Sequence, residues 1–453
     1  MVKFFRVAPE EAKPAGNAAL IEQYLPETAP PWPALGLPGA EILFLLPPCA
    51  ITMTNRKIDS PLVKLSLGIL SVIVGVASSS ANPPPEIAEP LRIIRAVGPE
   101  GRGNREASAA WKKLAESKAV MLLPILEAMD GANDYALNWL RAAFDAIASR
   151  ELSSGAKLPL PELGKFLLDT RHNPRARRLA FELIGRIDPS TTGKLLVGML
   201  NDPSLEIRLD AVQKAIDQAG QSLVASNNVG ATLLFQQALS AARDARQIDE
   251  IAKKLKDLGQ PVDLPKHFGF LTEWKVIGPF DNTGNKGFET AFPPEQKIDF
   301  KAEYEGKTGK VRWQDYVSQH KYGMVDMNQP CGKLKEVTAY ATMDFISDRA
   351  QPVELRLGGK NSWKVWLNGK LLFSRDEYHA NAEIDQYPMP AQLQVGRNTI
   401  LVKVCQNHEV EKWTNEWEFQ LRITDALGTP IVSAVQAGAD EARGAASNSP
   451  KNN

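Results

Sequence analysis

Two kinds of hydrophobic spacing divide the chain. Over residues 82–258, apolar side chains recur three and four positions apart, with breaks at proline, glycine and asparagine, and this is the spacing of amphipathic helices. Over residues 270–432, apolar and polar side chains alternate in short segments between turn residues, as in strands with one buried face. We therefore predict a multidomain protein, an all-α region followed by an all-β sandwich, with residues 259–269 as the linker.

The helical region contains an internal repeat. Three equivalent segments contain Ala143, Ala180 and Ala211, which are 37 and 31 residues apart, and periods of this length are typical of stacked helical pairs. In the unit with the clearest pattern, we expect Asp202 to cap the second helix and Pro203 to lie in its first turn. Each segment also has arginine two or three residues before its alanine: Arg141, Arg177 with Arg178, and Arg208.

The alternating region predicts strands that put every second side chain on one face. A sheet with one solvent-exposed face has to bury its other, apolar face against a second sheet, which favours a sandwich. Asn368-Gly369 is a strong signal for a two-residue hairpin turn. The expected inward-facing positions are Val337, Ala339, Ala341, Met343, Phe345, Val353, Leu355, Leu357, Trp363, Val365, Leu367, Ile400, Val402, Val404, Trp417, Phe419, Leu421 and Ile423.

The N-terminal part predicts export. Residues 53–81 have a basic start, an apolar run at 65–77 and small residues at 79–81, the order of a secretory signal peptide. The apolar run is shorter than the ~20 residues of a membrane-spanning helix, so we expect cleavage, no permanent membrane span, and a periplasmic or extracellular protein. Residues 1–52 are either a disordered extension or precede a true start at Met53, and residues 433–453 predict a disordered tail.

Charge and cysteine content limit the possible partners and disulfides of the protein. Lys and Arg balance Asp and Glu at 53 each, which argues against a nucleic-acid partner gripped through phosphates. Cys49 precedes the predicted signal segment, so the exported chain keeps Cys331 and Cys405. In an oxidising compartment these two either form one disulfide or remain two buried thiols.

Two segments of the chain resemble known protein families. Residues 363–370, followed by 393–404 with Gly396 and Asn398, resemble the galactose-binding-like jelly roll found as sugar-binding domains beside glycosidase barrels. The unit at residues 195–212 resembles a HEAT repeat. Together with residues 274–282, the chain over 86–432 resembles uncharacterised exported planctomycete-like bacterial proteins that join the two modules. The resemblance implies a HEAT-like α-solenoid followed by a jelly roll, and domains of this kind are usually non-catalytic.

Candidate ligand-binding residues gather in the loops of the sandwich, where binding groups usually lie. Tyrosine and tryptophan rings can stack on a sugar, while carboxylates and amides bond its hydroxyls. The alternative is that these are solvated loops in which His379 bonds to the backbone. Trp366 is singled out because it lies on the polar face of its strand. The candidates are Trp366, Asn368, Arg375, Tyr378, His379, Asp385, Asn407 and Trp413.

No catalytic or metal-binding motif is present in the sequence. Residues 281–287 offer oxygen ligands for calcium, but they lack enough carboxylates, and the histidines are too isolated for zinc, so we expect no cofactor. Three hypotheses follow. The first is a non-catalytic extracytoplasmic scaffold whose helical repeats bind a protein or cell-envelope component. The second is carbohydrate binding through the sandwich loops, and the third is a glycan-processing enzyme.

Overall fold

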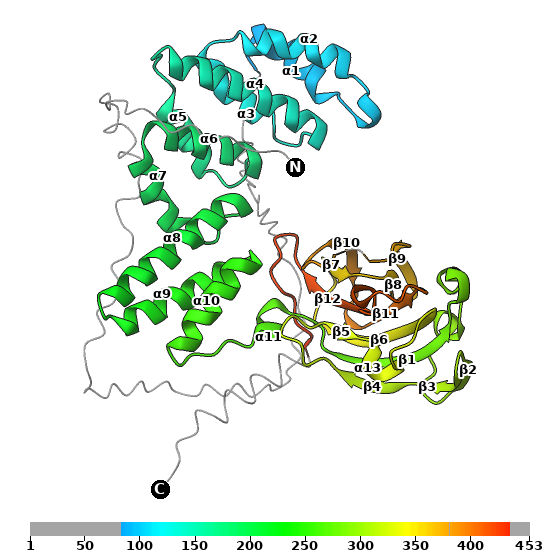
Figure 1. Ribbon diagram of the computed structural model, residues 1–453. Helices are drawn as coiled ribbons and strands as arrows, with labels where there is room; N and C mark the ends of the chain where they lie inside the picture. The colour runs from blue at the N-terminus through cyan, green and yellow to red at the C-terminus, as the bar shows by residue number, and fades with distance from the viewer. Residues whose placement is uncertain (1–82, 380, 435–453) are drawn as a thin grey trace, which may run out of the picture. The chain divides into compact units, whose positions relative to one another are not determined.

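The computed structural model describes residues 83–379 and 381–434 (Figure 1). Helices come first and antiparallel strands follow from Glu273 to Thr424, so the predicted change from helix to sheet is confirmed. The predicted extension 1–52, the signal segment 53–81 and residues 435–453 of the predicted tail lie outside the described residues. Among the helices that are described, none combines the length and the apolar character that a membrane span requires.

The chain divides into two compact units between Thr191 and Thr192. The division falls inside α7, so the later helices belong to the same unit as the strands. The helices before the sheets are α1 (Pro85–Arg95), α2 (Asn104–Ala115), α3 (Leu122–Glu127), α4 (Asp134–Ser153), α5 (Leu160–Leu168), α6 (Pro174–Ile187), α7 (Pro189–Leu195), α8 (Leu205–Val224), α9 (Asn228–Ala241), α10 (Ala245–Asp257) and α11 (Leu264–Phe268). The stretch predicted as a linker thus contains α11.

The repeated arginines explain the internal repeat only in part. Arg177 is 1% exposed, and its Nε donates to the carbonyl of Leu167 in the preceding helix at 2.7 Å. Arg208 is 5% exposed, and its Nε donates to the carbonyl of Asp202 at 2.9 Å. Arg141, by contrast, is exposed and lies 3.7 Å from Asp145. In two of the three units, therefore, the repeated arginine is buried. Its guanidinium donates to a backbone carbonyl that precedes the helix carrying the arginine.

The expected cap of α8 was wrong in detail. The helix begins at Leu205 with Ser204 at the N-cap position. Asp202 bonds instead to the amide of Ser204, at 2.8 Å from Oδ1. The Asp-Pro-Ser segment therefore makes a turn before the helix, because the Asp202 side chain and carbonyl are used to fix that turn, and Pro203 stays outside the first helical turn.

Two antiparallel sheets form the sandwich. The six-stranded sheet has the order β4-β1-β6-β11-β8-β9 and the four-stranded sheet the order β10-β7-β12-β5, with β2 and β3 as a separate hairpin. The strands are β1 (Glu273–Asp281), β2 (Glu303–Gly306), β3 (Gly309–Arg312), β4 (Gln314–Val317), β5 (Val325–Asp326), β6 (Val337–Ser347), β7 (Gln351–Gly359), β8 (Ser362–Leu367), β9 (Lys370–Arg375), β10 (Tyr387–Leu393), β11 (Gly396–Gln406) and β12 (Glu418–Thr424). Two short helices, α12 (Pro293–Gln296) and α13 (Asn328–Cys331), lie between strands in the sequence.

The predicted inward-facing residues form one core cluster between the sheets. Trp363 and Trp417 are among its largest buried side chains, with 1% and 0% exposure. The β8–β9 hairpin turns at Asn368 and Gly369, whose φ angles of 52° and 76° are both left-handed, as a type I′ turn requires. The alternation along the sequence therefore locates the sandwich core correctly.

The disulfide that the sequence leaves open is not formed, and Cys331 and Cys405 are free, buried thiols. Cys331 packs in the core between the sheets. Cys405 lies opposite Thr338 on β6, whose hydroxyl contacts its Sγ at 3.3 Å on the other face of that sheet. The two thiols are therefore on opposite faces. Burial raises the pKa of Cys331 to about 12 and that of Cys405 to about 11, so both stay protonated near neutral pH.

Within the second unit, the helices α8–α10 share a core with the sandwich. Their buried residues pack with Phe268 and Phe270, and with the partly buried Tyr322 of the sandwich. Arg243 Nη2 also donates to Thr429 Oγ1 at 3.1 Å, and Tyr322 bonds to Asp249 of α10. These contacts join the last helices and the strands into a single folded body.

Candidate functional site

Four of the eight candidate residues meet at one end of the sandwich, in two loops that follow β9 and β11. We call this group, Tyr378, His379, Asn407 and Trp413, the rim cluster. Its most exposed member is Trp413, with 61% of its surface accessible, whereas Asn407 is 3% exposed. An exposed indole above buried polar groups can offer a flat apolar surface to a ligand.

His379 connects the two loops of the rim cluster. Its Nε2 lies 3.1 Å from Asn407 Oδ1 and 3.3 Å from Glu409 Oε2. Its ring packs edge-on to Trp413, with ring centroids 5.1 Å apart and planes at 78°. The backbone at His379 is left-handed, with φ of 64°, and its amide donates to the Lys360 carbonyl at 2.5 Å. The imidazole is therefore held by both loops, and it fixes the orientation of Trp413.

Buried amide side chains support the rim from below. Gln406 Nε2 donates to the carbonyl of Thr414 at 3.0 Å, and Gln406 Oε1 accepts from the amide of Asn407 at 3.1 Å. Asn361 Nδ2 donates to the same Gln406 Oε1 at 3.2 Å and to the carbonyl of Glu416 at 3.1 Å. Because hydrogen-bonded buried groups resist rearrangement, these amides hold the loop that carries Trp413.

Tyr378 is partly exposed, and its hydroxyl is bonded within the site. Its hydroxyl accepts from Asn282 Nδ2 at 3.1 Å, and Asn282 also donates to the Gln406 carbonyl at 2.9 Å. Burial raises the pKa of Tyr378 to about 12, so the phenol stays neutral. That the ring of Tyr378 stacks on a ligand stays a prediction.

Asp385 and Arg375 lie outside the rim cluster. Asp385 accepts from Arg422 Nε at 2.6 Å and from Arg356 Nη1 at 2.8 Å. Burial alone would raise the pKa of Asp385, but the two arginines hold it below its ordinary value. Arg375 is exposed on β9, pairs with Glu377, and lies 5.3 Å from the Tyr387 ring centroid. Asp385 thus forms ion pairs with Arg422 and Arg356 that stabilise the second unit.

Trp366 and Asn368 are at a different place, on the outer face of the six-stranded sheet and in the β8–β9 turn. Trp366 packs at the edge of a small apolar cluster with Leu401 and Ile298. Asn368 donates to Asn398 Oδ1 at 3.0 Å and accepts from the Thr399 amide at 2.9 Å. Asn368 is therefore used by the turn, while Trp366 is partly exposed.

A buried charge that the sequence pattern does not reveal lies on the same outer face. Residues 282–300, which we call the strap, cross this face and are held by Lys403 of β11. Its side chain is 0% exposed, and Nζ donates to the carbonyls of Phe288 and Thr290 at 2.9 and 2.8 Å and to Glu295 Oε1 at 2.8 Å. Burial lowers the pKa of Lys403, and the bond to Glu295 opposes that shift. A lysine amid apolar strand residues was the available signal.

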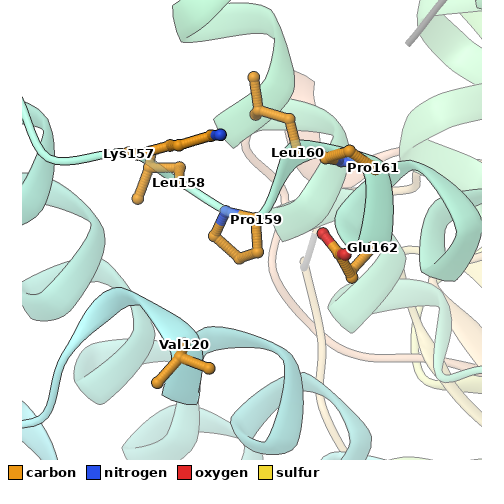
Figure 2. A pocket seen from close by; sticks show the side chains of 7 residues that line it. All are labelled: Val120, Lys157, Leu158, Pro159, Leu160, Pro161 and Glu162. Carbon is orange, nitrogen blue, oxygen red and sulfur yellow. The ribbon is translucent and has the colours of Figure 1, made fainter. Parts of the chain in front are cut away.

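Other features of the structure give less support for a binding site. A cavity of about 330 Å³ lies beside the start of α5 (Figure 2), lined by Val120, residues 157–161 and Glu162, with no aromatic ring among its side chains. Asp281 of the predicted calcium segment pairs with Lys307 at 3.1 Å. Within residues 83–379 and 381–434, no group of three or more His, Cys, Asp or Glu side chains is arranged to hold a metal.

Comparison with known proteins gives only distant likenesses. No family model and no curated protein matches the chain. Among solved structures, the PA14 domain of an antifreeze protein is 9% identical, with a TM-score of 0.19, over 36% of this chain and 69% of that one. The GH31 α-xylosidase of Xanthomonas citri is 10% identical, with a TM-score of 0.14, over 34% and 16%. The β-glucosidase of Kluyveromyces marxianus is 12% identical, with a TM-score of 0.23, over 68% and 37%. This chain spans 16% of the first enzyme and 37% of the second.

Proposed function

We propose that the protein is a non-catalytic, extracytoplasmic binding protein whose sandwich recognises carbohydrate at the rim cluster. The observation that carries this proposal is Trp413, a 61% exposed indole whose base is fixed by His379 and Asn407. Sugars are bound by an aromatic face together with a few fixed polar groups, and Glu409 supplies a carboxylate 3.3 Å from His379 Nε2. A preformed site also avoids the entropy cost of ordering the loops on binding.

We also propose that the helices form a HEAT-like solenoid, that the sandwich is a galactose-binding-like jelly roll, and that the chain is exported. The buried arginines Arg177 and Arg208 support a HEAT-like solenoid, and the tryptophan-bearing strand with its Asn-Gly hairpin supports a galactose-binding-like jelly roll. Export follows from the order of residues 53–81. N-terminal sequencing of the exported protein is expected to begin close to residue 82, whereas retention of the whole N-terminal segment would contradict export by a cleaved signal.

The test of carbohydrate binding is Trp413→Ala. We expect the variant to lose affinity for a soluble polysaccharide that retards the wild-type chain, by at least about tenfold, because the ring face is the largest apolar contact at the rim. Affinity gel electrophoresis over a series of neutral polysaccharides measures the loss. Val410→Ala is the matched control, since Val410 is 76% exposed in the same loop. Equal affinity of Trp413→Ala and the wild type would refute the rim as the site.

A second candidate is the protein-binding scaffold. It is favoured by exposed apolar side chains on neighbouring helices of the second unit, namely Val224 (89%), Val229 (75%) and Leu233 (62%). Such side chains on a rigid helical support are typical of protein-binding surfaces. If no polysaccharide retards the wild-type chain, this candidate takes precedence, and it requires a purified protein partner whose binding is weakened by Leu233→Asp but not by Trp413→Ala.

A further inference from the structure

A groove runs along the uncovered part of the outer face of the six-stranded sheet, beside the strap. One cavity of about 310 Å³ is lined by strap residues and by Trp366, Arg397 and Asp344. A second, of about 440 Å³, is lined by Lys275, Asp315 and again Asp344. Both cavities also touch Phe300, so they adjoin. We call these two cavities together the sheet-face groove.

The floor of the groove crosses five strands in register. Asp315 lies opposite Lys275, Lys275 opposite Thr342, Thr342 opposite Leu401, and Leu401 opposite Trp366. Strands lie about 4.8 Å apart, so four steps span ~19 Å. The groove is thus long and narrow, and it lies perpendicular to the strands.

The charges in the groove neutralise one another. Lys275 Nζ lies 2.5 Å from Asp315, Arg397 Nε lies 3.6 Å from Asp344, and Thr399 Oγ1 donates to Asp344 at 2.6 Å. Glu295, at the strap, is already paired with Lys403. Lys297 is paired with Asp299 at 3.5 Å, and Glu273 adds a carboxylate to the lining of the second cavity. An anionic ligand would therefore find no excess of positive charge, whereas hydroxyl groups can both donate to and accept from these side chains.

The apolar part of the lining is aromatic. Phe300 is 50% exposed, with Lys275 Nζ 5.5 Å from its ring centroid. Trp366 is partly exposed at the other end. Four strands of the floor, β1, β6, β11 and β8, pair on both sides, and β4 is the edge strand. A peptide that joined the free edge of β4 would run along that strand and not along the groove, which lies perpendicular to the strands. Cavities of this size suit a small or narrow ligand, since a folded protein partner needs a broader surface of ~800 Å² on each side.

From this geometry we infer that the sheet-face groove is a second binding site, separate from the rim cluster, for an elongated and uncharged oligosaccharide segment. Trp366 and Phe300 supply the stacking surfaces, and Arg397 and Asp344 bond the hydroxyls between them. The inference rests on the proposed function only for the class of ligand, because the residues that line the groove are different from those of the rim cluster.

The experiment uses the full chain and measures affinity for galactomannan, xyloglucan, mixed-linkage β-glucan and the anionic polygalacturonate. Trp366→Ala is expected to weaken binding of a neutral polysaccharide about tenfold. Arg397→Ala is expected to weaken it by a smaller factor, and because the Arg397 side chain is 73% exposed this variant keeps the fold. Lys370→Ala, exposed in the same hairpin but outside the lining, is the matched control and is expected to bind as the wild type does.

The outcomes separate the two sites. Loss of affinity in Trp366→Ala and Arg397→Ala supports the groove, and if Trp413→Ala then binds normally, the rim proposal fails while the groove stands. Wild-type affinity in both groove variants, with loss in Trp413→Ala, overturns the groove and leaves the rim. Absence of binding to every neutral polysaccharide overturns the groove, as does a preference for polygalacturonate that added salt abolishes.

Discussion

Replacing Lys403 by methionine is expected to destabilise the second unit by about 3–5 kcal/mol, because removing one partner of a buried ion pair leaves the other uncompensated. Glu295 is 15% exposed and would lose its cation, and the carbonyls of Phe288 and Thr290 would lose their donor. Urea unfolding followed by tryptophan fluorescence measures the change. The strap is expected to open before the rest of the sandwich, as faster amide exchange over residues 282–300 would record.

Two further variants test that explanation. Lys364→Met, on the same face, is the matched control and is expected to cost less than about 1 kcal/mol, because Lys364 pairs with a Glu289 side chain that is 80% exposed. Adding Glu295→Leu to Lys403→Met is expected to restore part of the lost stability, since an apolar pair can replace a buried ion pair at little cost, while the buried Tyr340 hydroxyl loses its bond to Glu295. A double variant no more stable than Lys403→Met would show that the strap is not held by this pair.

The second large effect is expected for Asp385→Asn. Arg422 and Arg356, whose side chains are 4% and 13% exposed, would then face each other without the carboxylate between them, at a cost of about 3–5 kcal/mol. Asparagine tolerates the left-handed backbone at this position, where φ is 63°, so the change isolates the charge. Glu354→Ala is the control, because Arg356 keeps Asp385 as its partner, and a similar loss in both variants would contradict a special role for Asp385.

The stability that Asp385 contributes depends on pH in a direction fixed by its pKa. The folded state holds this pKa below its ordinary value, so the stabilisation is fully present above the unfolded pKa of about 3.9 and disappears as the pH falls through the lower, folded value. The difference in free energy of unfolding between wild type and Asp385→Asn is therefore expected to be constant from pH 7 to about 5 and to shrink at lower pH. A difference that grows on acidification would contradict this assignment.

Local spacing was sufficient to predict the sandwich core, because alternation decides which face of a strand is buried. It could not predict the role of Lys403, since a lysine within a strand ordinarily faces water, and the strap that covers it shows no periodicity. Asp385 was placed among ligand residues for the same reason. Its partners Arg356 and Arg422 are 29 and 37 residues away in the sequence, and only the pairing of β7 with β12 brings those two arginines side by side.

The rim cluster was predicted more fully than the groove. His379 and Trp413 both lie in loops next to strand ends, so a sequence that locates the strands also locates them. The sheet-face groove depends on the register of five strands and on how far the strap extends across them. Of the groove, the sequence indicated only Trp366 and the turn beside it, because an aromatic side chain on the polar face of a strand breaks the alternation.

The core that α8–α10 share with Phe268 and Phe270 limits where the protein can be divided. A fragment starting at residue 265, within the predicted linker, would lack α8–α10 and leave both rings open to water, and we expect it to aggregate. A fragment starting at Thr192, where the compact unit begins, retains that packing and is expected to be recovered as a folded monodisperse species. For this chain, the helices next to the sheets are as necessary to the sandwich as its own strands.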